Sequence, residues 1–224
     1  MYHGIVPDNC PIDAWTFVKE SEFRKQMDIL AQYYDVVPIN RIKEVEFPTS
    51  GRNKPTAIIT FDDGYKNNYT HAFPILKEYG FPATVFVCSG LINKKDIFWY
   101  DKVIYSIQRT SCEHIDIGNK RFSFKAADTS KRWDRIQELL TYLKTKNKEE
   151  RTEIVEALVN FLHAEEDQQE YFILLSFEEI HELQKSDLVT IGAHTTTHEI
   201  LTGVSIEFAE RIIADTVNDT KRLF

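Results

Sequence analysis

Cysteine is scarce in this 224-residue chain, which contains only Cys10, Cys88 and Cys112. Their number is odd, they lie far apart in the sequence, and no Cys-x-x-Cys spacing occurs. A disulfide framework is therefore not expected, and the composition favours a reducing compartment. Because Cys88 ends the apolar run 84–87, we expect it to be a small buried side chain.

Long apolar runs and clusters of basic residues are also missing. No segment is long enough to span a membrane, and the formal net charge of -8 argues against nucleic acids and anionic membranes as partners. No basic and apolar leader follows Met1, which predicts a cytoplasmic protein, or a cell-surface or periplasmic one if upstream residues have been trimmed. Repeats are absent, and the hydrophobic fraction of 42% fits one globular enzyme domain.

The chain does contain a pair of acids at the end of a predicted strand. The run 57–61 is β-branched and aromatic, and Asp62 and Asp63 follow it directly, before the turn signal of Gly64. Successive strand side chains point to opposite faces, so one acid can bind a metal while the other faces a water molecule. Taken alone, a double acid at this place is more often a turn or a helix cap.

Two histidines stand at the end of a second predicted strand, residues 189–193. His194 follows this strand, and the spacing of four predicts that a helical turn returns His198 to the same side. A histidine pair alone is a weak signal, since histidines are often buried or solvated. The joint pattern is much stronger, because open α/β sheets and barrels place their sites at the C-terminal ends of strands.

Two histidines and one carboxylate, with an open position for water, form a known catalytic zinc arrangement. The metal lowers the pKa of its bound water to roughly 7, which gives a nucleophile near neutral pH. The motifs therefore predict a metal-dependent hydrolase. A non-haem iron oxygenase shares the ligand set and is the alternative from another class, but it leaves Asp62 without a role.

At these motifs the chain resembles the polysaccharide deacetylases, also called carbohydrate esterase family 4 or the NodB homology domain. The resemblance is specific over residues 55–92 and 174–224 and weak between them. Beyond the motifs it rests on Tyr69, Ala72, 74–76, 80–87, 175–180, 191–194, Leu201 and Thr202. It implies an irregular (β/α) barrel that removes acetate from an N-acetylated sugar, usually N-acetylglucosamine in a polymer or glycan.

Carried over by position, the resemblance makes Asp63, His194 and His198 the metal ligands and Asp62 the general base. It implies Zn2+ as the metal, with Co2+ or Ni2+ also accepted.

Two neighbouring residues are second-rank candidates for substrate binding. Thr195 stands where the family has serine or threonine, and we expect its hydroxyl to brace the loop more than to touch substrate. Tyr65 stands where many relatives have proline. It is expected to line the sugar site through its ring face or through a main-chain oxyanion contact.

The acid that protonates the leaving amine is where the chain departs from the family pattern. Most relatives carry an Arg-x-Pro-Tyr segment and a later Leu-x-His, and neither occurs here. Some relatives instead begin with a Tyr-His strand, which Tyr2 and His3 resemble, so His3 is the candidate acid. A structural role for His3 is an equal alternative. For the whole chain, the alternative function is a catalytically impaired relative that binds metal and glycan.

Strands are predicted at 2–6, 36–39, 57–61, 83–88 and 189–193, with helices between them. The family barrel has seven strands, so the pattern indicates a barrel that is C-terminally incomplete. A homodimer would cover the exposed edges of such a sheet.

Two helices have clear apolar patterns. The first is predicted over 21–34, capped by Ser21, with an apolar stripe of Phe23, Met27, Leu30 and Ala31. The last is opened by Ser205, with an apolar face of Ile206, Ala209, Ile213 and Val217.

An insertion at about 91–175 breaks the alternation of strands and helices. It opens with an aromatic cluster at 98–100, expected in the core with sugar stacking as the alternative. A hairpin is predicted around Gly118 and Asn119, followed by helices over 130–147 and 148–164. The apolar stripes of these two helices predict that they pack against each other. The alternative is that the stripes form a lid or a surface that binds a partner. The stripes include Trp133, Ile136, Leu140, Leu143, Ile154, Leu158 and Phe161.

Overall fold

The computed structural model describes residues 1–44, 54–94, 96–124, 129–162 and 170–223. The chain divides into two compact units, the first made of residues 1–96 and 173–224 and the second of residues 97–172. All the predicted site residues belong to the first unit. We predicted that this second unit is an insertion into a single domain, and this stays a prediction.

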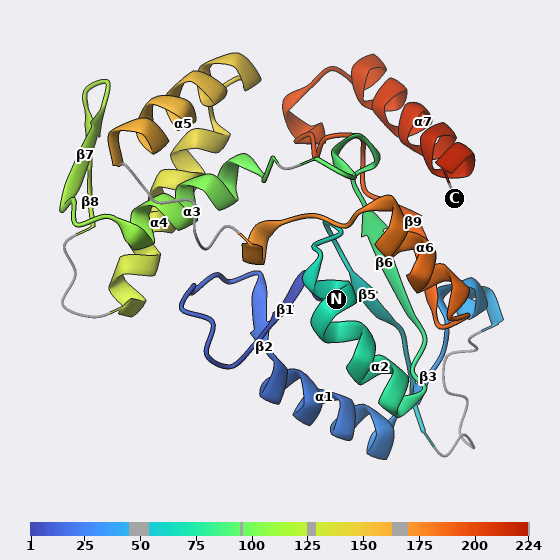
Figure 1. Ribbon diagram of the computed structural model, residues 1–224. Coiled ribbons are helices and arrows are strands. Elements are labelled where there is room, and N and C mark those ends of the chain that lie inside the picture. The colour runs from blue at the N-terminus through green and yellow to red at the C-terminus, as the bar shows by residue number, and fades with distance from the viewer. Residues whose placement is uncertain (45–53, 95, 125–128, 163–169, 224) are drawn as a thin grey trace. The chain divides into compact units, whose positions relative to one another are not determined.

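A parallel sheet of three strands forms the centre of the first unit. β5 (Ile59–Phe61) and β9 (Val189–Ala193) lie on either side of β6 (Ala83–Val87), as Figure 1 shows. Because the three strands are parallel, the C-terminal ends of β5 and β9 lie at the same edge of the sheet. The strand predicted over 189–193 is confirmed with these bounds.

Two pairs of short parallel strands belong to the same unit. β1 (Gly4–Val6) pairs with β2 (Phe17–Lys19), and β3 (Asp35–Val36) pairs with β4 (Thr56–Ala57). The predicted strand 57–61 is thus interrupted at residue 58, and the strand predicted over 36–39 is cut short because a 3-10 helix starts at residue 39. The strands that are described do not close into one continuous sheet.

The backbone of Tyr2 attaches the N-terminal strand to β5. The Tyr2 N–H donates to the carbonyl oxygen of Thr60 at 2.8 Å, and the Asp62 N–H donates to the carbonyl of Tyr2 at 2.9 Å. This bridge places His3 beside the end of the strand that leads into the acid pair.

The helices of the first unit cover the sheet. They are α1 (Glu20–Tyr33), a π-helical turn (Asn68–Ala72) that continues into α2 (Phe73–Tyr79), α6 (Phe177–Lys185) and α7 (Ile206–Leu223). Short 3-10 helices lie at Ile39–Glu44, Ser89–Leu91 and Leu201–Gly203. No helix in the part of the chain that the structure describes is long and apolar enough to cross a membrane.

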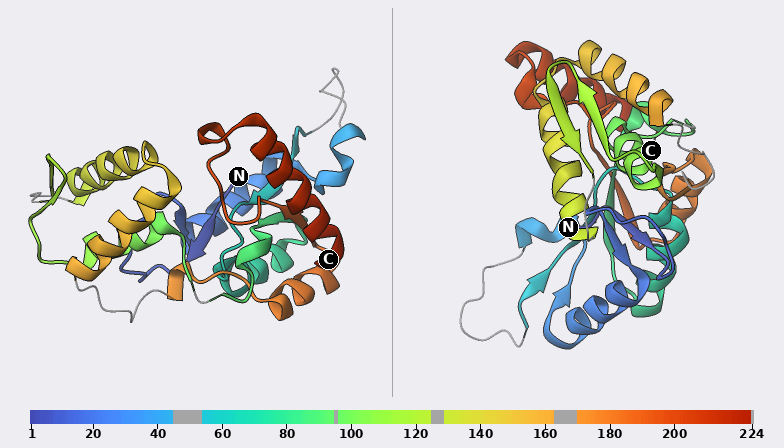
Figure 2. Two further views of the ribbon diagram at one scale, coloured as in Figure 1. Left: turned by 90° about the horizontal axis from the view of Figure 1, so that it is seen from above. Right: turned by 90° about the vertical axis from the view of Figure 1, so that its left-hand side faces the viewer.

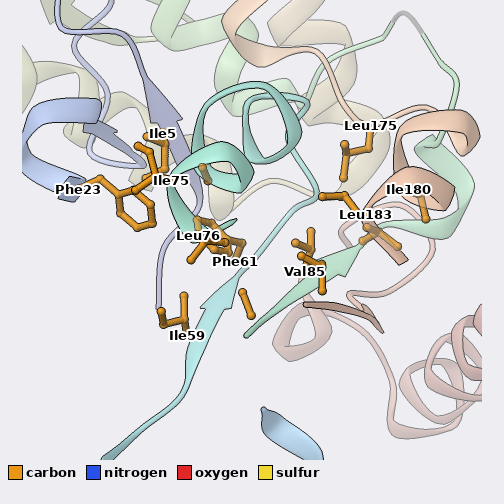
Figure 3. Close-up of a cluster of buried hydrophobic side chains, with 14 of the residues drawn as sticks. Ile5, Phe23, Ile59, Phe61, Ile75, Leu76, Val85, Leu175, Ile180 and Leu183 are labelled. Carbon is orange, nitrogen blue, oxygen red and sulfur yellow. The ribbon is translucent and has the colours of Figure 1, made fainter. Parts of the chain in front are cut away.

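A buried hydrophobic core joins the strands to these helices. Phe61 is fully buried at its centre, and burying a side chain of this size stabilises the fold by about 2 kcal/mol. Figure 3 shows the residues around it: Ile5, Phe23, Ile59, Ile75, Leu76, Val85, Leu175, Ile180 and Leu183.

The predicted start of α1 is wrong by one residue. The helix begins before Ser21, and its first turn is capped from outside, because the Asp8 carboxylate accepts a hydrogen bond from the Ser21 N–H at 3.1 Å. The predicted stripe is confirmed for Phe23 and Met27, which are buried, whereas Ala31 is exposed.

The second unit combines α3 (Trp99–Arg109), a hairpin of β7 (His114–Ile117) and β8 (Lys120–Ser123), α4 (Thr129–Lys144) and α5 (Lys148–Leu162). The predicted hairpin is confirmed, with Gly118 in the left-handed region at φ 62°. Figure 2 shows the hairpin beside α4.

The predicted packing of the last two helices of this unit is wrong. α5 packs against α3, and α4 packs against both α3 and β8. The central residues of α3, Val103, Ile104 and Ile107, are buried, whereas Phe161 on α5 is exposed. The predicted helix end at residue 164 lies outside the described residues. Phe98 is buried and stacks on Tyr100 with ring centroids 5.1 Å apart, which fits the expected core position of this cluster.

The predicted packing face of α7 is also wrong. Ser205 does open the helix, since its hydroxyl oxygen accepts from the Phe208 N–H at 3.3 Å. Ile213 and Val217 are exposed, however, and the helix packs through Ile212 and Thr216. The reason is polar: the Thr216 hydroxyl lies within hydrogen-bond distance of a threonine in the loop after β9, and Asp219 accepts from Ser89.

Two adjacent isoleucines test this orientation of α7. Ile212 is 7% exposed and Ile213 is 50% exposed. We expect Ile212→Ala to lower the free energy of unfolding in urea by about 2 kcal/mol, because it leaves a cavity, and Ile213→Ala to change it by less than about 0.5 kcal/mol. Equal losses in the two variants would contradict the packing described here.

Candidate metal centre

The three predicted metal ligands come together at the C-terminal edge of the sheet. Asp63 lies just beyond β5, and His194 directly follows β9. One oxygen of Asp63, Oδ1, lies 3.2 Å from Nε2 of His194 and 3.1 Å from Nε2 of His198. One donor atom from each of the three residues can be chosen so that all lie within 4.8 Å of one another. One buried carboxylate and two imidazoles thus converge on a single point.

The histidine motif is a loop and not the predicted helical turn. Its backbone enters the left-handed region twice, at Thr195 with φ 63° and at His198 with φ 59°. Asp63 is left-handed as well, with φ 73°. Such conformations cost about 1 kcal/mol or more for residues other than glycine. This backbone, and not helical periodicity, turns His198 toward Asp63.

Backbone and side-chain bonds fix the start of this loop to β6. The His194 N–H donates to the carbonyl of Val87 at 2.9 Å, and the Cys88 thiol lies 3.1 Å from the carbonyl oxygen of His194. Cys88 is buried as predicted, and burial raises the pKa of its thiol. It therefore remains a neutral donor to the backbone of a metal-ligand candidate.

Gly90, in the 3-10 helix after β6, allows a close approach to the same loop. Its N–H donates to the carbonyl of Thr196 at 2.8 Å. A Cβ atom at this position would lie 2.8 Å from that same oxygen, which is closer than side-chain carbons come to other atoms. The Thr196 hydroxyl meets that of Thr216 on α7 at 3.3 Å. The loop is therefore fixed between β6 and α7.

The carboxylate of Asp63 is 2% exposed. Burial alone raises the pKa of such a group, but the close contacts with the imidazoles of His194 and His198 outweigh it and hold the pKa of Asp63 well below its usual range. The same contact acts on His194, whose pKa is raised by its hydrogen bond to Asp63 although burial opposes this. An anionic oxygen and two imidazole nitrogens are suitable ligands for a divalent transition metal.

Asp62 and His3 lie in the electrostatic surroundings of this triad. The charge of Asp62 acts on the imidazoles of both His194 and His3. Burial lowers the pKa of His3, and the negative charges of Asp63 and Asp62 oppose that effect. The predicted acid and the predicted base are thus in the same part of the molecule.

Two asparagines at the start of the π-helical turn hold β1 and the residue before it, His3. The Asn68 amide donates to the carbonyl of His3 at 2.6 Å, and the Asn67 side-chain oxygen accepts from the Ile5 N–H at 3.1 Å. Both asparagines are buried. Sequence reasoning missed them, because the bonds join residues more than sixty positions apart and no local pattern marks them.

The second-rank candidates do not take the expected roles through their side chains. Tyr65 is fully buried and lies edge-on to Phe17, with ring centroids 5.8 Å apart. Its ring is therefore part of the hydrophobic core and does not line a sugar site. The oxyanion contact through the Tyr65 main chain stays a prediction. The Thr195 hydroxyl is buried and has no hydrogen-bond partner among the residues described. The neighbouring Thr197 makes the local bonds instead, through its N–H and hydroxyl to Glu199.

Known proteins with similar sequences support the predicted resemblance to the polysaccharide deacetylases. The family model for polysaccharide deacetylase matches residues 49–223. YxkH of Bacillus subtilis (strain 168) is 29% identical over 150 residues, which are 61% of this chain and 50% of that protein. Poly-beta-1,6-N-acetyl-D-glucosamine N-deacetylase of Escherichia coli (strain K12) is 33% identical over 79 residues, 35% of this chain and 12% of that protein. The matches thus span half or less of these relatives.

Solved structures agree at the level of the fold. IcaB from Ammonifex degensii matches with a TM-score of 0.54 and 17% identity, covering 99% of this chain and 66% of that one. BC0361, a polysaccharide deacetylase from Bacillus cereus, matches with a TM-score of 0.52 and 17% identity, covering 99% and 45%. The fold is therefore of the predicted (β/α) barrel type, although the described strands form no closed sheet. Since the family model spans most of the chain, including both motifs, this chain belongs to the polysaccharide deacetylase family.

Proposed function

We infer that this chain is a metal-dependent N-deacetylase that releases acetate from an N-acetylated sugar in a polysaccharide or surface glycan. The observation that carries the proposal is the convergence of Asp63, His194 and His198 on one point, with Asp62 next to Asp63 in the chain. Membership of the polysaccharide deacetylase family supports the same reaction.

Asp63, His194 and His198 would hold the metal, with Zn2+ as the first choice and Co2+ or Ni2+ as alternatives. Their donor set fits, because the three donor atoms are close together and the carboxylate is strongly acidic. When bound, such an ion polarises a carbonyl group and lowers the pKa of a water molecule.

The chain's own residues would then move the protons. In the proposed reaction Asp62 takes a proton from the attacking water, for which its half-buried position beside the triad is suitable. His3 gives a proton to the leaving amine. Its lowered pKa makes protonated His3 a stronger acid than an exposed histidine would be.

The substrate class is inferred from chemistry and from relatives. The Escherichia coli relative is named for a polymer of N-acetyl-D-glucosamine, and an uncharged glycan is compatible with the net charge of -8. We therefore propose N-acetylglucosamine oligomers as substrates, with the linkage to be found by testing β-1,4 and β-1,6 series. A homodimer stays a prediction.

Acetate release from these oligomers tests the base. We expect Asp62→Asn to reduce kcat by about 10²-fold or more, and chelation of the metal to abolish release. Asp187→Asn is the matched control, because Asp187 is exposed and its left-handed backbone suits asparagine. Metal binding without any acetate release by the wild-type protein would favour the catalytically impaired alternative.

A separate variant tests the acid. If His3 protonates the amine, His3→Ala lowers kcat by about 10²-fold while the affinity for Zn2+ and the melting temperature stay close to those of the wild type. His181→Ala, at an exposed position, is the control. Loss of stability together with activity would instead assign His3 a structural role.

The stability of the metal-free protein should depend on pH through the triad. His194 has a raised pKa, so its contribution is complete below pH 6.5, its usual pKa, and is lost as pH rises through the folded value. Asp63 has a lowered pKa, so its contribution is present above pH 3.8 and is lost as pH falls through the folded value. Above pH 6.5 the melting temperature of the metal-free protein should therefore fall as the pH rises through the folded pKa of His194, whereas the lowered pKa of His3 affects stability mainly below pH 6.5.

Zinc should reverse this trend, because its histidine ligands must be unprotonated. Asp63→Asn is the control, since it removes the partner that raises the pKa of His194. Identical pH profiles for Asp63→Asn and the wild-type protein, measured by thermal unfolding, would contradict the predicted coupling.

A further inference from the structure

Trp15 is an exposed tryptophan in a segment that otherwise buries its apolar residues. It is 59% exposed, whereas Ile12, Ala14 and Thr16 are each at most 5% exposed. Trp15 lies in a turn between the buried residues Ala14 and Thr16, and its side chain is directed outward. A large aromatic side chain turned toward solvent beside a catalytic centre suggests a contact with a ligand.

The segment that carries Trp15 is fixed in place. The Phe17 N–H donates to the carbonyl of Ala14 at 2.9 Å, and the Gly4 N–H donates to that of Thr16 at 3.0 Å. The Lys19 ammonium group donates to the carbonyl of Cys10 at 2.6 Å. A side chain on such a backbone loses little conformational entropy when it binds a ligand, so its contact area is converted efficiently into affinity.

The position of Trp15 links it to the metal centre. Its ring lies edge-on to the imidazole of His3, with centroids 5.1 Å apart and planes at 67°. The charges of Asp63 and both metal-ligand histidines act on that imidazole. A sugar whose acetamide group lies at the triad would therefore have Trp15 beside its ring.

We propose that Trp15 binds the substrate by stacking against the face of a sugar ring next to His3. The proposal rests on the function proposed above and adds a residue that recognises the glycan itself. A β-linked glucosamine ring carries its polar groups around its rim, which leaves C–H groups on both faces. Such an apolar face packs well on an indole ring, and the stacking excludes water from His3 and the leaving amine.

The test compares Trp15→Ala, Trp15→Phe and the control Tyr33→Ala, which removes another exposed aromatic ring, 54% exposed, from the same unit. Acetate release gives KM and kcat, and calorimetry gives Kd for the same N-acetylglucosamine oligomer. We expect Trp15→Ala to raise KM and Kd by about tenfold, Trp15→Phe to restore most of the affinity, and Tyr33→Ala to match the wild type. The absorption spectrum of bound Co2+ should be the same in all four proteins.

The outcomes separate this proposal from the proposed function. Wild-type KM and Kd in Trp15→Ala would overturn the stacking role, and so would a wild-type protein that binds no oligomer. If the wild-type protein binds the oligomer through Trp15 but releases no acetate in the presence of metal, the deacetylase function falls and the role of Trp15 stands. An altered Co2+ spectrum in Trp15→Ala would also count against the proposal, because it would mean that Trp15 acts by shaping the metal site.

Discussion

The parallel register of β5, β6 and β9 is the constraint on which the rest of the structure depends. Ile59 lies opposite Ala83, and Ala83 lies opposite Val189. This pairing determines where β5 and β9 end at the edge of the sheet. It therefore determines the positions of Asp63 and His194, which follow these strands. A slip of one residue would turn every following side chain to the other face of the sheet. The buried residues that fix the register, such as Phe61, thus hold the metal centre as well as the fold.

The buried carboxylate of Asp63 links the stability of the site to its chemistry. An ion removed from water costs several kcal/mol unless a partner of opposite charge or a set of hydrogen bonds compensates it. The two imidazoles can supply that compensation by holding a proton, and a divalent cation can supply it by taking the proton's place. The contact between carboxylate and protonated imidazole stabilises both charged forms, which explains why it both lowers the pKa of Asp63 and raises that of His194. A bound metal would compete with these protons for the same atoms.

Sequence reasoning was most successful where the determining interactions are local. The strand 189–193, the hairpin at Gly118 and the burial of Cys88 follow from short patterns of apolar and turn residues. The metal-ligand candidates were found because their motifs end apolar strands. The shape of the loop from His194 to His198 was not found, since bonds to β6 and α7 override the helical spacing that the sequence suggests.

Long-range bonds account for the other differences. On α7 the apolar pattern indicated Ile213 and Val217, but the face that packs is the one where Thr216 contacts the Thr196 hydroxyl and Asp219 accepts a hydrogen bond from Ser89. The asparagines that hold β1 and the contact of Trp15 with His3 likewise join parts of the chain that no local pattern connects. Such pairs become visible only once the strands are placed.

The site has two halves that different bonds hold in place. The ligand half is fixed by β5, β6, β9 and the loop bonds to Val87 and Thr216. The half with His3 and Trp15 lies on and beside β1, which Tyr2 and the two asparagines attach to β5 and the π-helical turn. Because the halves are separately held, the acid of the proposed reaction can come from the N-terminal segment while the residues proposed to bind the metal lie after β5 and β9. This separation would allow the proposed acid, His3, to be replaced without displacing the residues proposed to bind the metal.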